Sequence, residues 1–245
     1  MRVPLCTIVI GASAALVLAT AGTAAAMSKP GSRGPRAVGD AAASGWGIVK
    51  SPNPLVRNGM VTAVSCAAAN ACEAVGAYPS SSSSFNDVTL AETWNGTVWK
   101  HQTTPNPPTE IYSALLGVSC TAANACEAVG YSSFGTLAEA WNGTAWSLQT
   151  TPNPAGATGS RLSGVSCTAA NACEAVGSYT NSAEKGVTLA EAWNGAAWTL
   201  QTTPNPAGAT GSGLSGVSCS AAGSCQADGS YTIGRREFTL VIARS

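Results

Sequence analysis

The chain of 245 residues carries 12 basic and 12 acidic side chains, and only 10% of its residues are charged. This balance excludes a basic surface for nucleic acid and a charged face for polyanions. The composition is instead typical of an extracellular β-protein whose polar surface is built from Ser, Thr, Asn and Gln.

The first segment has the pattern of a targeting sequence. Arg2 is followed by an apolar run that ends in Thr23-Ala24-Ala25-Ala26. This pattern predicts a cleavable signal peptide over residues 1–26, after which we expect no membrane association. An uncleaved membrane anchor is the alternative, because the run is just long enough to span a bilayer. Residues 27–44 are rich in Gly, Pro and Ser and predict a disordered linker, which leaves residues 45–245 as the folded domain.

The folded domain repeats itself. Its second copy reads GVSCTAANACEAVG, then TLAEAWNG, then AWSLQTTPNP. A period of about fifty residues is typical of propellers and other repeat arrays. Within this copy, four short apolar or β-branched runs bounded by turn residues predict strands over residues 115–120, 127–132, 136–141 and 144–151.

Eight of the nine cysteines form four pairs of identical spacing, one pair in each repeat. They are Cys66 and Cys72, Cys120 and Cys126, Cys167 and Cys173, and Cys219 and Cys225. An even count in an exported chain predicts disulfides, and the repetition favours a bridge within each pair. Zinc is the alternative, but zinc pairs sit about two to four residues apart and the chain has a single histidine, His101. We therefore expect no metal and no cofactor.

An Asn-Gly pair follows a tryptophan in three repeats and predicts a two-residue turn of type I′. In the second copy this turn places Trp141 opposite Thr144 and Glu139 opposite Trp146, so that the rings and the carboxylate share one face. We predict that the tryptophans pack between sheets, and a sugar-stacking platform is the alternative. The tryptophans are Trp46, Trp94, Trp99, Trp141, Trp146, Trp193 and Trp198.

The two ends of the domain complement each other. The last repeat stops after residues 239–244, which match TLAEAW, and so lacks a fourth strand. Residues 46–54 match residues 198–206 position by position, with no strands before them. This arrangement predicts an all-β, four-bladed β-propeller whose closing blade is shared between the termini, with Ile48 beside Val241. Closure of this kind removes exposed sheet edges.

Length variation among the repeats lies between the second and third strands. These connections share a rim with the loops that join one blade to the next, and insertions on one rim indicate a binding face. The alternative is that they are ordinary solvated loops. The non-repeated residues of this rim, our candidate ligand-binding set, are Phe85, Asp87, Glu110, Phe134, Arg161, Glu184, Lys185, Arg235 and Arg236.

The motifs SC-x5-C, AVG, TLAE-x-WNG and W-x-x-Q-TPNP resemble those of a group of secreted actinobacterial repeat proteins. The resemblance covers residues 46–244. The chain is also distantly similar to kelch and related propellers, although it lacks the double glycine of kelch repeats. The resemblance implies export and a propeller-like fold, and it implies no known reaction.

Two functions remain open. The first is a secreted, non-catalytic binding or adhesion module for an extracellular glycan or protein, associated with the cell surface or wall and monomeric or homodimeric. The second is a propeller-type polysaccharide hydrolase or lyase, which would need a unique pair of carboxylates. The chain has three aspartates, its glutamates mostly recur with the repeat, and it has no nucleophile elbow or phosphate loop. The sequence therefore favours binding and names no catalytic residue.

Overall fold

A computed structural model of the chain describes residues 45–52, 58–80, 86–108 and 111–245. The chain divides into two units, residues 1–46 and 47–245, and the second unit is described here. The predicted signal peptide and linker lie outside the described residues and stay predictions. Among the described residues, no helix has the length and apolar character needed to cross a membrane.

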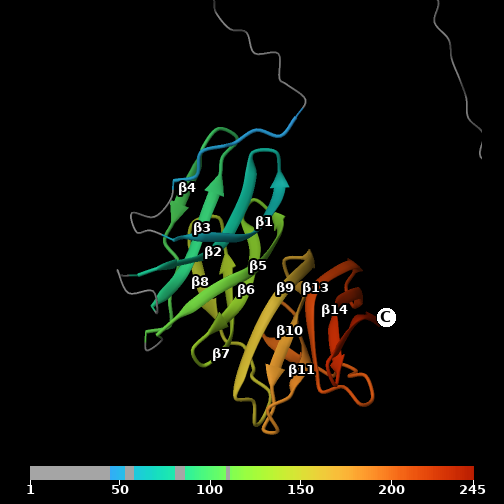
Figure 1. Cartoon of the computed structure of the whole chain (residues 1–245). Coiled ribbons are helices and arrows are strands. Elements are labelled where there is room, and N and C mark those ends of the chain that lie inside the picture. The colour runs from blue at the N-terminus through green and yellow to red at the C-terminus, as the bar shows by residue number, and fades with distance from the viewer. Residues whose placement is uncertain (1–44, 53–57, 81–85, 109–110) are drawn as a thin grey trace, which may run out of the picture. The chain divides into compact units, whose positions relative to one another are not determined.

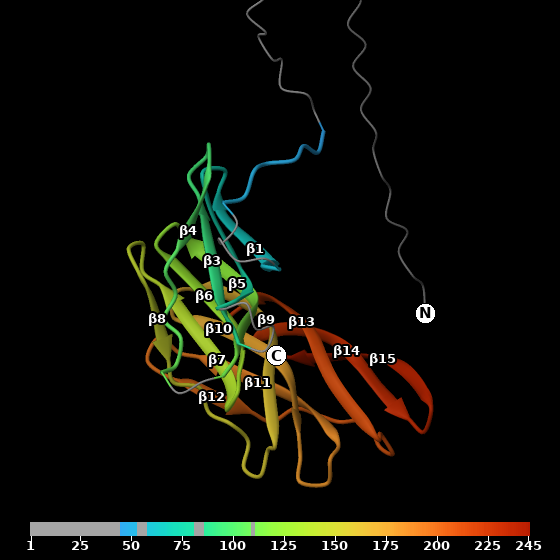
Figure 2. The same ribbon diagram turned by 60° about the vertical axis from the view of Figure 1, so that its left-hand side comes forward.

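The described residues form four antiparallel sheets that follow one another along the chain (Figures 1 and 2). The first sheet contains β1 (Met60–Ala68), β2 (Ala71–Pro79), β3 (Asp87–Trp94) and β4 (Trp99–Gln102). The second contains β5 (Ser113–Ala122), β6 (Ala125–Ser132), β7 (Gly135–Trp141) and β8 (Trp146–Gln149). The third contains β9 (Gly159–Ala169), β10 (Ala172–Thr180), β11 (Gly186–Trp193) and β12 (Trp198–Gln201), and the fourth β13 (Gly211–Ala221), β14 (Ser224–Ile233) and β15 (Arg236–Arg244). The all-β, propeller-like repeat of four sheets is thus confirmed.

One disulfide closes the first hairpin of each sheet, as predicted. Cys120 lies opposite Cys126 in the register of β5 and β6, and the corresponding pairs of the other three sheets are bridged in the same way. Four bridges in one domain indicate an oxidising environment, since thiols are kept reduced in the cytosol of most organisms.

The Asn-Gly hairpins differ from the prediction. Trp141 pairs directly with Trp146, so residues 142–145 form a four-residue loop instead of a two-residue turn. The reason is the Asn142 side chain, whose Oδ1 accepts hydrogen bonds from the backbone nitrogens of Thr144 and Ala145, both at 2.9 Å. Glu139 consequently lies opposite Leu148, although it still shares a face with the two rings.

The second, third and fourth sheets each pack on the preceding sheet through their first strand. Strand β5 contacts β1, β2 and β3, strand β9 contacts β5, β6 and β7, and strand β13 contacts β9, β10 and β11. Glycine allows this close approach: a Cβ atom on Gly117 would lie 3.1 Å from Cα of Gly164, and one on Gly164 would lie 3.2 Å from Cα of Gly216. The first strands therefore form the centre of the array.

A ladder of serine hydrogen bonds joins these first strands. Ser65 Oγ accepts a hydrogen bond from the Cys120 backbone nitrogen at 2.9 Å, and Ser119 and Ser166 accept the equivalent bonds from Cys167 and Cys219 at 3.0 Å. In the first three sheets, the serine before the first cysteine thus links its own sheet to the disulfide of the next sheet.

Two tryptophans fill the space between successive sheets. Trp146 is 5% exposed and packs with Val75 and Ala91 of the first sheet, and its Nε1 donates to Oε1 of Gln102 at 2.6 Å. Trp198 is 4% exposed and repeats this arrangement on the second sheet, donating to Gln149 at 2.6 Å. The tryptophan and glutamine of WxxQ therefore tie one sheet to the preceding one.

The structure corrects the prediction of a shared closing blade. Residues 46–52 form no strand, the fourth sheet has three strands, and both Ile48 and Val241 are exposed. No short hairpin brings the N-terminal segment to β15, because almost the whole domain separates them in the chain. Instead, Ser51 donates its hydroxyl to both carboxylate oxygens of Glu92, at 2.8 and 2.9 Å, on the first sheet.

Two glutamates are fully buried between the sheets. Glu139 and Glu191 are both 0% exposed, and none of their carboxyl oxygens has a hydrogen-bond partner of ordinary geometry in the described part of the chain. Burial raises the pKa of each to about 8, and the hydroxyls of Thr89 and Thr136 on the preceding sheets offset only part of this effect. Both groups are therefore neutral carboxylic acids in the folded protein at neutral pH.

Because Glu139 and Glu191 are neutral when buried, we predict that the protein becomes less stable as the pH rises. Between about pH 4.5 and about pH 8 the unfolded chain releases the two protons while the folded chain keeps them. At ~1.4 kcal/mol per proton and pH unit, the two protons lower the free energy of unfolding by up to ~10 kcal/mol across this window. Urea unfolding at pH 5 and pH 8 measures the change. The variant Glu139→Gln/Glu191→Gln should lose the larger part of it, and the rest comes from Glu73 and Glu127, whose pKa values burial raises to about 7. An unchanged pH dependence in that variant would contradict the assignment.

A second prediction concerns the glycine that ends each AVG motif. A Cβ atom on Gly130 would lie 1.9 Å from the Ala114 carbonyl oxygen, because β5 is bulged between Leu115 and Gly117. Gly130→Ala should lower the free energy of unfolding by about 2 kcal/mol or more. Gly159→Ala, at a position with open space around it, is the control and should change stability by less than about 0.5 kcal/mol.

Candidate functional site

A hollow lies between the second and third sheets, at the rim that carries the β6–β7 and β10–β11 turns. It is a cleft of about 620 Å³. Its walls combine four aromatic side chains, one arginine and many hydroxyl groups. The lining residues are Tyr112, Tyr131, Ser132, Ser133, Phe134, Gly135, Asn153, Ala157, Thr158, Gly159, Ser160, Arg161, Ser178, Tyr179, Thr180 and Gly186.

The wall of the second sheet is held by a short turn and an asparagine. Gly135 has a φ of 141°, and a Cβ atom there would overlap the side chain of Asn153. Because glycine leaves this space free, Asn153 Oδ1 reaches the backbone nitrogen of Thr136 and accepts its hydrogen bond at 3.2 Å. The Pro-Asn-Pro segment between the sheets is thereby fixed against the base of the β6–β7 turn.

The start of β5 is fastened to the same turn. The Ser133 backbone nitrogen donates to the Tyr112 carbonyl oxygen at 3.0 Å, and the Tyr112 backbone nitrogen donates to Ser133 Oγ at 3.1 Å. The connection from the first sheet to the second and the β6–β7 turn therefore lie at the same rim. The variation in repeat length predicts this arrangement for a binding face.

Aromatic rings dominate the wall of the second sheet. The rings of Tyr112 and Tyr131 lie 6.0 Å apart with an angle of 63° between their planes. Phe134 is 69% exposed at the tip of the β6–β7 turn, and Tyr179 lines the opposite wall from β10. Exposed rings with one accessible face are suited to stacking on a flat apolar surface of a ligand.

The polar character of the cleft comes from neutral donors and acceptors and from Arg161. The described lining residues include no carboxylate, and Arg161 is exposed at the start of β9. Hydroxyl groups can each donate and accept, and the arginine guanidinium offers donors in a planar fork. The cleft can therefore hold a ligand rich in hydroxyl or carboxylate oxygens, but it offers no acid and base pair.

The structure brings only part of the predicted rim together. Phe134 and Arg161 line the cleft. Glu184 and Lys185 lie in the β10–β11 turn beside it, where Glu184 has a φ of 59° and donates its backbone nitrogen to Asn181 O. The remaining described members are separate from the cleft: Asp87 begins β3, and Arg235 and Arg236 lie at the β14–β15 turn. Phe85 and Glu110 lie outside the described residues.

Sequence reasoning missed the tyrosines of the cleft. Tyr131 and Tyr179 follow the AVG motif of their repeats by one and two residues, and Tyr78 and Tyr231 occupy the equivalent region of the other two repeats. The predicted ligand-binding set contains only residues that do not recur between repeats, and these tyrosines do recur. A tyrosine at the rim end of every second strand was the signal that could have located this wall.

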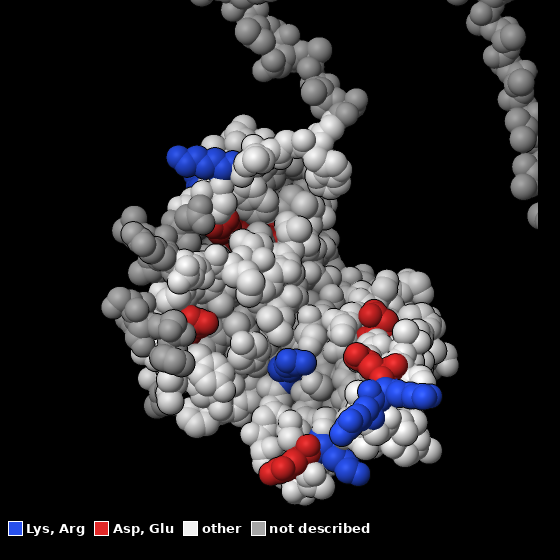
Figure 3. Space-filling model, viewed as in Figure 1, with Lys and Arg blue, Asp and Glu red and all other residues white. Residues whose placement is uncertain are grey.

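Charged side chains are sparse around this surface. In the view of Figure 3 most of the face is uncharged, and the charged side chains gather mainly over the third and fourth sheets. No group of three or more His, Cys, Asp or Glu side chains suited to a metal ion occurs among the described residues.

The comparisons with known proteins add no relative to this picture. No protein-family model matches the chain, and no curated protein matches it.

Proposed function

We propose that the protein is a non-catalytic binding module that recognises a glycan through the cleft between the second and third sheets. The observation that carries the proposal is the pairing of exposed aromatic rings with many neutral hydroxyl groups in one cleft of about 620 Å³. Sugars present an apolar face made of C–H groups and an edge of hydroxyls, and this surface matches both features.

The alternative of a polysaccharide hydrolase has less support from the geometry. Glycosidases use two carboxyl groups that flank the scissile bond, and the described residues of the cleft contribute none. Burial raises the pKa of five described glutamates, and none of them lines this cleft: Glu73, Glu127, Glu139, Glu174 and Glu191. They serve packing in this proposal and do not act on a substrate.

The proposed place of action is outside the cell. The signal peptide expected over residues 1–26 and the four disulfides support export, and a cell wall offers glycan chains as ligands. The motif resemblance to secreted actinobacterial repeat proteins and, distantly, to kelch-type propellers agrees with this role.

The test is binding to immobilised glycans. The purified protein should bind a defined subset of a glycan array, and Phe134→Ala should weaken binding about fivefold or more, since loss of a well-placed aromatic contact costs at least ~1 kcal/mol. Arg161→Gln should weaken binding of acidic glycans more than binding of neutral ones. Isothermal titration with the best glycan gives the dissociation constants.

Phe238→Ala is the matched control, because it removes an exposed phenylalanine from β15, away from the cleft. It should leave glycan affinity unchanged. Equal effects of the two phenylalanine variants, or no glycan binding at all together with binding to a peptide library, would overturn the proposal. Product release from a polysaccharide would revive the enzyme alternative.

A further inference from the structure

A second hollow, of about 320 Å³, lies between the third and fourth sheets. Its lining residues include Val176, Ala190 and Gln201 from the third sheet and Val217, Cys225 and Ala227 from the fourth. This hollow is separate from the cleft proposed to bind glycans, and it occupies a place that the other sheets fill with their own side chains.

The equivalent place on each preceding sheet holds a tryptophan. Trp198 packs between Val129 and Ala138 of the second sheet and Cys173 and Ala175 of its own sheet. By the repeat, these four positions correspond to Val176, Ala190, Cys225 and Ala227 around the hollow. The core between the third and fourth sheets contains Val176, Ala190, Leu214, Ala227 and Leu240, and no tryptophan. The hollow thus has the lining that surrounds a tryptophan between the other sheets, but it contains no tryptophan side chain. We call it the socket.

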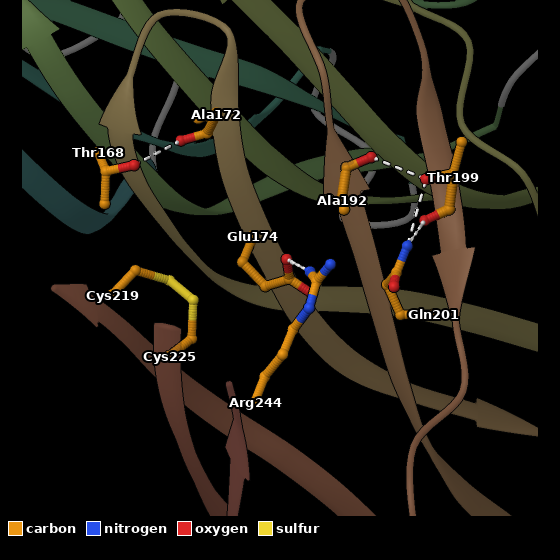
Figure 4. A network of polar contacts seen from close by, with 9 residues as sticks. All are labelled: Thr168, Ala172, Glu174, Ala192, Thr199, Gln201, Cys219, Cys225 and Arg244. Atoms are coloured by element: carbon orange, nitrogen blue, oxygen red, sulfur yellow. Dashed lines mark hydrogen bonds and ion pairs between the residues drawn. A yellow bond between two sulfur atoms is a disulfide. The ribbon is translucent and has the colours of Figure 1, made fainter. Parts of the chain in front are cut away.

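The hydrogen-bond acceptor of the socket is also in place. Gln102 and Gln149 accept from the indole nitrogens of Trp146 and Trp198. Gln201 is the third member of this series. Its Nε2 instead donates to the Thr199 hydroxyl at 3.3 Å and to the Thr199 carbonyl oxygen at 3.5 Å (Figure 4). Arg244 reaches from β15 to Glu174 of the third sheet at the border of the socket.

The free edge of β15 marks the strand that would carry the missing indole. In the third sheet, Ala190 pairs with Gln201, Glu191 with Leu200 and Trp193 with Trp198. By the repeat, β15 would pair Val241 with Val49, Ile242 with Ile48, and Arg244 with Trp46. Trp46 would then enter the socket, and Ile48 would meet Ile242, so that an apolar pair replaces the Glu191 and Leu200 pair of the third sheet.

The segment before β1 is held at the opposite end of the array. Ser51 donates to Glu92 of the first sheet, as Thr89 and Thr136 face the equivalent glutamates from the preceding sheets. Ser51 therefore ties the end of this segment to the first sheet, while Trp46 and Ile48 are fully exposed and free to reach another sheet. Among the described residues, the closely contacting strand pairs of different sheets join consecutive sheets, and no such pair joins the fourth sheet to the first.

We propose that residues 46–51 of a second copy of this chain complete the fourth sheet, with Trp46 of that copy in the socket between the third and fourth sheets. The first sheet of one copy then packs on the fourth sheet of the other, and the serine ladder continues from Ser218 of one copy to the Cys66 backbone nitrogen of the other. Two copies related by a twofold axis form two such contacts and close a ring of eight sheets, within the range of known propellers, which is about four to eight blades.

Cysteine pairs test this arrangement. Directly opposite residues of antiparallel strands lie about 4.5–5.5 Å apart at Cα, a separation that a disulfide can bridge. Purified Ile48→Cys and Ile242→Cys chains, mixed and oxidised, should yield a covalent dimer on a non-reducing gel. Ile48→Cys mixed with Val241→Cys is the matched control, because position 241 points to the other face of β15 and should cross-link poorly although it is more exposed.

The double variant Ile48→Cys/Ile242→Cys distinguishes the two possible donors. A cross-linked species of twice the chain mass supports the second copy as donor. A cross-link within one chain overturns the second copy as donor and shows closure by the same chain. The absence of a cross-link, or equal cross-linking in the control, shows that residues 46–51 do not dock on β15. Light scattering of the unmodified protein should give twice the chain mass, reduced to one chain mass in Trp46→Ala and unchanged in Phe134→Ala.

Discussion

The structure depends on one contact repeated three times, the close approach of the first strand of each sheet to the first strand of the next. Gly117, Gly164 and Gly216 allow this approach at the second and third of these contacts, and the serine ladder holds all three. This contact sets the distance between neighbouring sheets. Farther from the first strands, that distance leaves room for one indole ring, so the places of Trp146 and Trp198 and of their glutamine acceptors follow from it.

Local features of the fold were predictable from sequence. Strand positions follow from short apolar runs between turn residues, and pairing within each cysteine pair follows from its recurrence in every repeat. The Asn-Gly turns were not predicted correctly because Asn142, Asn95 and Asn194 use their side chains to cap a longer loop. That interaction competes with the backbone preference on which the prediction relied.

Contacts between repeats were less accessible to sequence reasoning. The cleft required knowledge of which loops two successive sheets bring together, so Tyr131 and Tyr179 were missed while Phe134 and Arg161 were found. The match of residues 46–54 to the fourth strand of a repeat identified a strand that could pair with β15, but a sequence match contains no information about which copy of the chain supplies it. The number of sheets is independent of that question, since each sheet forms its hairpins locally.

Because the first strands of neighbouring sheets meet in the same way at each of the three described contacts, the array has no unique central contact between first strands. Inserting or deleting one whole repeat would lengthen or shorten the row without requiring a new kind of contact, since the added glycine, serine, tryptophan and glutamine would meet the same partners. Gene duplication can therefore change the size of this protein in single steps.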